Sequence, residues 1–472
     1  MRTQLYIDGT WVDGSGTLEV IDPSDGTVIA SVATSSDEQN EQAIAAADRA
    51  AASWAATAPR VRAEILRKAF EIMTAEADQI AELISRENGK ALPDAKGEVA
   101  YAAEFFRWFS EEASRTSGDY RKSPSGDKRI LVTHQPIGVS VLITPWNFPA
   151  GMATRKIGPA VAAGCTMILK PAGETPLTAL HIVDIMERAG LPKGVLNVIL
   201  PANTGPAMSK VLHDPRVKNL SFTGSTAVGK ILLREAADQV IRCSMELGGN
   251  APFVVLDDAN IEEAVKGLML AKMRNGGAAC TSANRIYVAR SIGDKFIAEF
   301  AKAMAALKMG VGREAGTTLG ASVSIKERNK ISDLVDGAKS RGAKVHTGAV
   351  LPEGPGAFYP ATVIEVSPTD EILVNEIFGP VAPVVLFDTD EEALKLANDT
   401  EYGLISYVYS EDLKRAIRFA EAMESGMVAI NRGMISDPAA PFGGVKQSGL
   451  GREGGFDGIH EFLQTKYIGV EI

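Results

Sequence analysis

Apolar segments of strand length alternate with segments of helical spacing between residues 139 and 247. The apolar segments are VSVLIT, TMILK, VLNVIL, VKNLSF and IRCSMEL, and each interval between them can hold one helix. Continuous apolar strands that are separated by helices are typical of a parallel sheet covered on both faces, because parallel neighbours need a crossover connection. We therefore predict a doubly wound α/β domain, in which ligands bind where the strands end.

A second region of the same kind follows, from about residue 251 to residue 441. Its apolar segments are 251–256, 285–289, 361–366, 383–387 and 405–409. Ala- and Glu-rich stretches at 37–85 and 98–114 carry apolar residues at helical spacing, and we expect them to cover the first sheet. A chain of 472 residues is too long for one core, so two α/β domains agree with its length.

A third, smaller unit is expected from two segments that are distant in sequence. Residues 459–470 have a β-like pattern without an obvious neighbour, and residues 128–135 do too, so the two could pair. A terminal strand of this kind often pairs across a subunit boundary, which favours a homodimer or homotetramer. The predicted division is a first α/β unit (1–114 and 137–248), a second α/β unit (249–445) and a β segment (115–136 and 456–472).

Composition argues against several classes of function. The net charge of −10 opposes broad binding to nucleic acid. No segment approaches the ~20 apolar residues of a membrane span, and the start lacks the apolar run of a secretory signal. The three cysteines, Cys165, Cys243 and Cys280, have no CxxC spacing, so neither a disulfide framework nor a zinc site is predicted. We expect a cytoplasmic protein without a bound metal.

One cysteine has an unusual neighbourhood. Cys280 follows Gly276, Gly277, Ala278 and Ala279, whose small side chains would leave the sulfur open on one side. A thiolate is a strong nucleophile, and an accessible cysteine needs only a lowered pKa and a nearby base for covalent chemistry. The alternative is a buried core residue, since cysteine is among the most buried residue types.

Two glycine patterns compete for the role of a dinucleotide site. GLGREG (449–454) fits GxGxxG, but the chain ends before a βαβ unit can follow, so we interpret it as a turn. FTGSTAVGK (222–230) follows an apolar strand and opens a helix, with Gly224 at the turn, Ser225 as an added donor and Gly229 one turn later. The free amides and the dipole of a helix N-terminus suit a pyrophosphate. A capped helix with a tight turn is the alternative.

Two polar residues are predicted near the ends of strands. Glu246 precedes Gly248 and Gly249, and burial there would raise its pKa toward that of a useful general base. Asn147 lies in TPWNFPAG after the first strong strand, and its side-chain amide could donate a hydrogen bond to an oxyanion. Taken singly, Glu246 could form a loop salt bridge and Asn147 could be a turn residue.

Taken together, these segments resemble the NAD(P)-dependent aldehyde dehydrogenase family. The resemblance covers nearly the whole chain and rests on PWNFP, LKPAGETP, FTGSTAVGK, MELGGN, the Cys280 segment, NEIFGPV and PFGGVKQSGLGREGG. It implies an α/β fold with two doubly wound domains and a small β oligomerisation segment. It also implies NAD or NADP as cofactor and a small aldehyde as substrate.

The resemblance implies a role for each matched position. Cys280 would add to the aldehyde and form a thiohemiacetal, and the Asn147 amide and the Cys280 N–H would hold its oxyanion. After hydride transfer to nicotinamide, Glu246 would activate the water that hydrolyses the thioester, and Lys156 would help to position the site and the cofactor ribose. The positions implied to bind the cofactor are Trp146, Lys170, Gly224, Ser225, Gly229, Glu376 and Phe378.

Within the family, the chain is most similar to succinate-semialdehyde dehydrogenases. In that subfamily two arginines and a serine grip the distal carboxylate of the substrate, and the matching residues here are Arg155, Arg274 and Ser436. A guanidinium suits a carboxylate because it pairs bidentately and stays charged. The alternative is that either arginine forms a structural ion pair.

Departures from the subfamily leave the substrate and the cofactor open. Ala278 and Ala279 replace Gln-Thr before the nucleophile, and Ser282 replaces a second cysteine, so no redox switch of paired cysteines is expected. The smaller residues could widen the pocket for a longer or aromatic semialdehyde. A general aldehyde dehydrogenase and an inactive scaffold on this fold are further alternatives. Gly173 stands where NAD-preferring members carry a glutamate, with Glu174 one place later, so NADP, or both cofactors, stay open.

Overall fold

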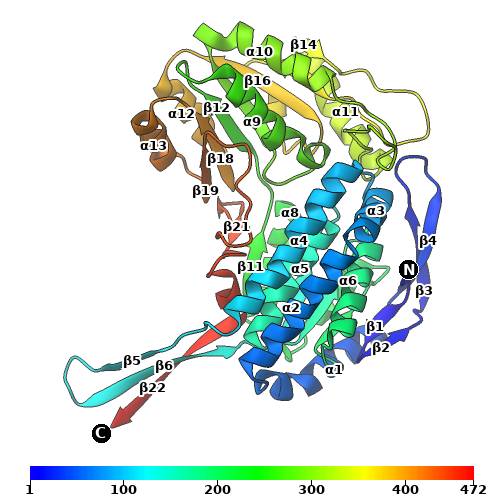
Figure 1. Cartoon of the computed structure of the whole chain (residues 1–472), viewed down its shortest axis with the longest axis vertical. Coiled ribbons are helices and arrows are strands. Elements are labelled where there is room, and N and C mark those ends of the chain that lie inside the picture. Colours follow the sequence, from blue (N-terminus) through cyan, green and yellow to red (C-terminus); the bar gives the residue numbers. More distant parts are fainter. Residues whose placement is uncertain (472) are drawn as a thin grey trace.

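The computed structural model describes residues 1–471, and its first sheet supports the candidate site (Figure 1). The sheet has the spatial order β21 (Gly449–Leu450), β11 (Arg242–Glu246), β10 (Val217–Thr223), β7 (Val139–Ile143), β8 (Met167–Lys170) and β9 (Leu196–Val198). The strands from β11 to β9 run parallel, and β21 is antiparallel to β11. The parallel sheet predicted between residues 139 and 247 is therefore confirmed.

Helices from two parts of the chain enclose this sheet. They are α1 (Asp37–Ala55), α2 (Pro59–Ala75), α3 (Ala77–Asn88), α4 (Leu92–Glu112), α5 (Pro149–Ala163), α6 (Pro176–Ala189), α7 (Thr204–Leu212) and α8 (Thr226–Ala237). In Figure 1, α4 crosses in front of α5, and α2 packs against both. Every residue of α5 is buried, including Arg155 and Lys156. Because buried charges need partners, Arg155 and Lys156 each require an anionic or polar neighbour inside the protein.

The second sheet has seven strands and carries the cysteine segment at one end. Its spatial order is β14 (Lys344–Thr347), β15 (Thr362–Glu365), β16 (Val381–Phe387), β13 (Ala283–Ala289), β12 (Ala251–Val255), β18 (Ile405–Tyr409) and β19 (Met427–Ile430). The strands run parallel except β14, which is an antiparallel edge. Its helices are α9 (Ile261–Met273), α10 (Arg290–Ala305), α11 (Ile325–Ser340), α12 (Asp390–Asn398) and α13 (Leu413–Ala422). All five predicted strands occur, whereas β14 and β19 were not predicted.

A three-stranded arm projects from the body and contains the end of the chain (Figure 1). It consists of β5 (Asp119–Lys122), β6 (Lys128–Pro136) and β22 (Leu463–Glu471). Strands β22 and β6 pair antiparallel along their whole length, from Leu463 opposite Pro136 to Glu471 opposite Lys128. The predicted pairing of two segments distant in sequence is confirmed.

The remaining strands are short and lie at the margins. The β-like opening of the chain is a hairpin of β1 (Leu5–Ile7) and β2 (Thr10–Val12), followed by a second hairpin of β3 (Gly16–Ile21) and β4 (Val28–Thr34). Strands β17 (Tyr402–Gly403) and β20 (Val445–Lys446) pair near the end of the second sheet. Within residues 1–471, no helix has the length and apolar character needed to cross a membrane.

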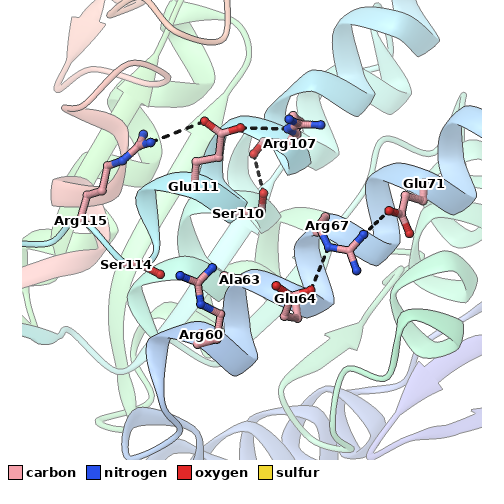
Figure 2. A pocket seen from close by; sticks show the side chains of 10 residues that line it. All are labelled: Arg60, Ala63, Glu64, Arg67, Glu71, Arg107, Ser110, Glu111, Ser114 and Arg115. Carbon is pink, nitrogen blue, oxygen red and sulfur yellow. Dashed lines mark hydrogen bonds and ion pairs between the residues drawn. The ribbon is translucent and has the colours of Figure 1, made fainter.

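A surface hollow between α2 and α4 is lined by charged side chains (Figure 2). Arg67 pairs with Glu64 and Glu71, and Arg107 pairs with Glu111, all within single helices. Exposed pairs of this kind each contribute only ~0.3–0.5 kcal/mol. The ion pairs of this hollow therefore contribute little to stability.

Candidate active site

Cys280 lies in a loop between α9 and β13, on an irregular backbone. A short 3₁₀ turn, η1 (Arg274–Gly277), follows α9, and Asn275, Gly276 and Gly277 all have positive φ angles of 54°, 58° and 81°. A Cβ at Gly277 would lie 2.1 Å from the carbonyl oxygen of Gly379. The glycines before the cysteine thus permit a tight backbone path. Their small size was expected from the sequence to leave the sulfur open, and the structure gives this second reason for them.

The sulfur of Cys280 faces a cavity of about 200 Å³ between the sheets. The side chain is half-buried, and the cavity is also lined by Asn147, Met152 and Phe378. Burial raises the pKa of the Cys280 thiol to about 12, and the guanidinium of Arg155 is the strongest opposing influence. A thiol in this state needs a base or a bound ligand before it becomes a nucleophile.

Asn147 reaches the cysteine loop from the turn between β7 and α5. Its Nδ2 donates to the carbonyl oxygen of Ala278 at 3.2 Å. Because a carbonyl can only accept, the amide nitrogen rather than the oxygen must face Ala278. One N–H of the same nitrogen remains for an oxyanion on a substrate bound to Cys280. The structure therefore brings Asn147 and Cys280 together, as the sequence predicts.

Glu246 is the last residue of β11 and is buried, with 2% of its surface exposed. Neither carboxylate oxygen has a hydrogen-bond partner among residues 1–471. Burial raises the pKa of Glu246 well above its usual value, and the nearby Glu453 adds to the rise, whereas Arg155 and Lys156 oppose it. The direction agrees with the prediction for a general base.

Glu453 was not predicted as a site residue, although it pairs with both cations of α5. Its Oε1 accepts from Lys156 Nζ at 2.6 Å, and its Oε2 lies 2.6 Å from Arg155 Nε. Lys156 also donates to Ser221 Oγ at 2.9 Å. Although burial opposes it, Arg155 and Lys156 hold the pKa of Glu453 below its usual value. Both cations on α5 thus pair with one carboxylate from the GLGREGG segment.

This contact bears on the role expected for Arg155. The guanidinium is 1% exposed, lies 4.2 Å from the ring centre of Phe442 and has Glu453 as its internal partner. The contact matches the structural ion pair that was the alternative in the sequence interpretation. The signal that could have identified Glu453 was its segment, GLGREG, which we interpreted only as a turn.

Arg274 has a different environment. Its guanidinium carbon lies 4.9 Å from the ring centre of Phe148 and 5.2 Å from that of Tyr101. Among residues 1–471, it has neither a hydrogen-bond partner nor an ion-pair partner. Ser436 is half-buried in the loop after β19, and its side chain makes no hydrogen bond within the same residues. Arg274 is therefore a cation near Cys280 without an ion pair within residues 1–471, although it lies outside the lining of the cavity and its charge opposes the rise in the pKa of Asp94.

A larger cavity of about 730 Å³ lies at the carboxyl ends of β7, β8 and β10. Trp146, Lys170, Gly224 and Ser225 line it. Ser225 caps α8 by accepting from Val228 N, and both residues line the cavity, so the start of this helix borders it. Burial lowers the pKa of Lys170, and Glu174 opposes this effect. An anion-binding helix start beside a lysine fits a dinucleotide.

Gly229 serves packing rather than ligand contact. A Cβ at this position would lie 2.4 Å from Leu247 Cδ2, so only glycine lets α8 approach the segment after β11. Gly229 does not line either cavity, whereas Gly224 lines both. Gly229 therefore determines how closely α8 packs against the segment after β11.

Glu376 and Phe378 line the smaller cavity together with Cys280. Glu376 Oε1 accepts from Gly249 N at 3.1 Å, and burial raises the pKa of Glu376 to about 7. Phe378 has a φ of 57° and contacts Trp146 edge to face at 5.3 Å. Trp146 lines both cavities, so a dinucleotide in the larger one can extend to the sulfur.

Residues of the α3–α4 region hold the Trp146–Asn147 loop in place. This role was not predicted from the sequence. Lys90 Nζ donates to Asn147 O at 2.7 Å, and Asn88 Nδ2 donates to Trp146 O at 3.0 Å. Glu98 accepts from Ala150 N at 2.8 Å. The available signal was a glutamate on the buried face of α4, beside Ala95, Val99 and Ala102.

The pattern of the aldehyde dehydrogenase family matches residues 11–468. The chain is 53% identical over 444 residues to a succinate-semialdehyde dehydrogenase of Paenarthrobacter nicotinovorans, which covers 94% of this chain and 99% of that protein. It is 46% identical to a glutarate-semialdehyde dehydrogenase of Pseudomonas putida, with 100% and 98% covered. The crystal structure of an NADP-dependent enzyme of E. coli has a TM-score of 0.98 at 43% identity and covers 100% of this chain and 98% of its own. The chain therefore belongs to the aldehyde dehydrogenase family.

Proposed function

We propose that this enzyme oxidises an aldehyde with an acidic group at its far end, with succinate semialdehyde as the first candidate and succinate as its product. The observation that carries the proposal is Arg274, whose guanidinium lies against Tyr101 and Phe148 and has no ion-pair partner among residues 1–471. Its charge is close enough to Cys280 to oppose the rise in the pKa of the thiol. An unpaired guanidinium beside the nucleophile favours a substrate that brings its own carboxylate.

In the proposed reaction, the Cys280 thiolate adds to the aldehyde carbon, and the Asn147 amide donates a hydrogen bond to the resulting oxyanion. When bound, the nicotinamide of NAD or NADP accepts the hydride that leaves this carbon. Glu246 then removes a proton from the water that attacks the thioester. Burial and the charge of Glu453 raise the pKa of Glu246, whereas Arg155 and Lys156 lower it, and together they set its basicity.

For the cofactor, we propose that the helix start at Gly224 and Ser225 binds the pyrophosphate, with Trp146 and Lys170 beside the adenosine half. Glu376 and Phe378 would hold the nicotinamide half. Gly173 lines the larger cavity and carries no carboxylate, whereas the neighbouring Glu174 also lines it and interacts with Lys170. Because position 173 itself cannot repel a 2′-phosphate, we expect both NAD and NADP to support turnover.

A five-carbon substrate, glutarate semialdehyde, is the second candidate. Ala279 contacts Phe148 and Met152, and its methyl group is the smallest side chain in that cluster. A relative named for glutarate semialdehyde is nearly as similar as the one named for succinate semialdehyde. We expect the ratio of kcat/KM for the two substrates to decide between them.

The proposal predicts a selective effect of Arg274→Gln. The KM for succinate semialdehyde should rise at least about 10-fold, because a hydrogen bond to a charged group contributes ~1.5–3 kcal/mol. Steady-state reduction of NAD⁺ and NADP⁺ measures this, with the uncharged pentanal as the control substrate. If Arg274→Gln changes both aldehydes equally, the acidic group is not recognised by Arg274.

We also propose a location, an oligomeric state and a division into domains. The protein would act in the cytoplasm as a homodimer or homotetramer joined through the arm of β5, β6 and β22. Its division would be a dinucleotide-binding domain (1–114 and 137–248), a catalytic domain (249–445) and the arm segments (115–136 and 456–472). Ser436 would assist Arg274 at the far end of the substrate.

A further inference from the structure

One backbone oxygen joins three segments of the site. The carbonyl oxygen of Asn147 accepts from Lys90 Nζ at 2.7 Å and from Asn275 Nδ2 at 2.8 Å. Lys90 lies between α3 and α4, and Asn275 lies in the turn η1 that precedes Cys280. The same Asn275 nitrogen also donates to Ala278 O at 3.0 Å. This oxygen therefore links the Asn147 loop both to Lys90 and to the cysteine loop.

Lys90 is held in place by a buried carboxylate. Its Nζ lies 2.5 Å from Glu98 Oε2, and the two side chains are 1% and 0% exposed. The other oxygen of Glu98 accepts from Ala150 N at 2.8 Å and Gly151 N at 3.3 Å, in the first turn of α5. A carboxylate at a helix N-terminus is stabilised by the helix dipole. Lys90 and Glu98 thus hold both the Asn147 carbonyl and the helix that follows it.

The side chain of Asn147 depends on this backbone contact. Its Nδ2 has one acceptor, Ala278 O, and its Oδ1 is buried without a hydrogen-bond partner among residues 1–471. An amide that is anchored at one atom is oriented mainly by the backbone that carries it. Effective donors to an oxyanion must be pre-positioned to well within 1 Å, because misplacement of that size is costly.

We propose that Lys90, held by Glu98, is a positioning residue that sets the Asn147 amide against the Cys280 sulfur. The inference rests on the proposed role of Asn147 as the oxyanion donor. Lys90 itself touches neither substrate nor cofactor. It acts by fixing the Asn147 carbonyl in the bifurcated contact that Asn275 completes from the cysteine loop.

The test compares Lys90→Met with a matched change elsewhere. Lys272 in α9 is also a fully buried lysine, but its Nζ has no hydrogen-bond partner among residues 1–471. Lys90→Met should lower kcat by about 10-fold to 100-fold, less than the ~10²–10³ lost when an oxyanion donor is removed outright. Lys272→Met should leave kcat within about 2-fold. Melting temperatures are measured for both variants.

A double-mutant cycle with Asn147→Ala separates positioning from a general effect on the fold. If Lys90 acts through Asn147, the kcat lost in Lys90→Met largely disappears in the Asn147→Ala background. A loss that persists in full there overturns the inference. If Asn147→Ala alone leaves kcat unchanged, the proposed role of Asn147 is wrong instead, so the two failures are distinguishable.

A second variant covers the case in which Lys90→Met does not fold. Glu98→Gln keeps an oxygen for Ala150 N or for Lys90 but removes the charge that holds the ammonium group. The same cycle with Asn147→Ala applies, and a smaller but equally non-additive loss of kcat is expected. The rate of Cys280 alkylation by iodoacetamide should stay within about 2-fold of the parent enzyme, and a large change would show that the cysteine loop itself has moved.

Discussion

At the scale of single residues, the charged groups near Cys280 differ in their partners. Arg155 and Lys156 share Glu453, while Arg274 has no ion pair among residues 1–471. Glu246 lies beside this cluster with both oxygens free of hydrogen bonds from residues 1–471. Adjacent carboxylates resist joint ionisation, so the proton affinity that Glu453 loses to the cations is retained by Glu246. This asymmetry suits Glu246 to accept a proton from water.

Glu246→Gln should therefore separate the two halves of the reaction. Formation of the thioester should persist, whereas its hydrolysis should slow by ~10² or more, because a positioned general base contributes ~10²–10⁴. A rapid-mixing experiment should record a burst of about one NADH or NADPH per subunit and then a slow steady state. A linear time course at the parent rate would contradict the assignment.

The pH dependence of the parent enzyme tests the same residue. The pKa of Glu246 is raised by burial, and a protonated carboxyl group cannot accept a proton from water. The steady-state rate should fall as the pH drops through this raised pKa, at values above the usual range for glutamate. The burst rate should not follow the same curve. Identical pH profiles for burst and steady state would remove Glu246 from the hydrolytic step.

At the scale of elements, two buried glutamates fix the helices that follow the loops of the first sheet. Glu98 accepts from the first turn of α5, and Glu87 accepts from Leu177 N and Thr178 N of α6, both at 2.8 Å. Both glutamates come from the α3–α4 region, which we predicted only as a cover for the sheet. These helices therefore also hold the loops at the ends of β7 and β8.

Glu87 makes stability depend on pH in a direction that can be measured. Burial raises the pKa of Glu87 from 4.5 to about 7. Its favourable contribution is thus complete below the unfolded pKa of 4.5 and is lost as the pH rises through about 7. Glu87→Gln cannot ionise, so its melting temperature relative to the parent should increase between about pH 5 and pH 8.5. A difference that is constant across this range would contradict the raised pKa.

At the scale of the whole molecule, the arm presents apolar side chains that this single chain does not cover. Tyr120, Tyr467, Ile468 and Val470 are between 39% and 64% exposed. Exposed apolar groups on an edge of paired strands mark a surface for association. We proposed above that a second copy of the chain covers them.

Ile468→Lys tests this surface without removing a strand. The substitution should shift the mass in solution toward the monomer, because a buried lysine without a partner is costly at an interface. Light scattering coupled to size-exclusion chromatography measures the mass, and Lys466→Ala on the same strand serves as a control. A parent protein that is already monomeric would contradict the proposed oligomer.

The sequence by itself determined the elements and the residues that chemistry marks locally. Strand β7 is a mainly apolar run, and Glu246 and Ser225 lie at a strand end and a helix start, so their positions follow from neighbours in the chain. The likeness of whole segments to known enzymes supplied the roles expected for Cys280 and Asn147.

Only the tertiary structure decided which charges are neutralised and which are free. Lys156 and Glu453 are 297 positions apart, and Lys90 and Asn147 are 57 positions apart, so no local pattern connects them. Arg155 and Arg274 resemble each other in sequence as candidate substrate ligands, yet one meets Glu453 and the other meets two aromatic rings. The physical reason is burial, because a charge removed from water requires a partner, and only the folded chain determines which partner is near.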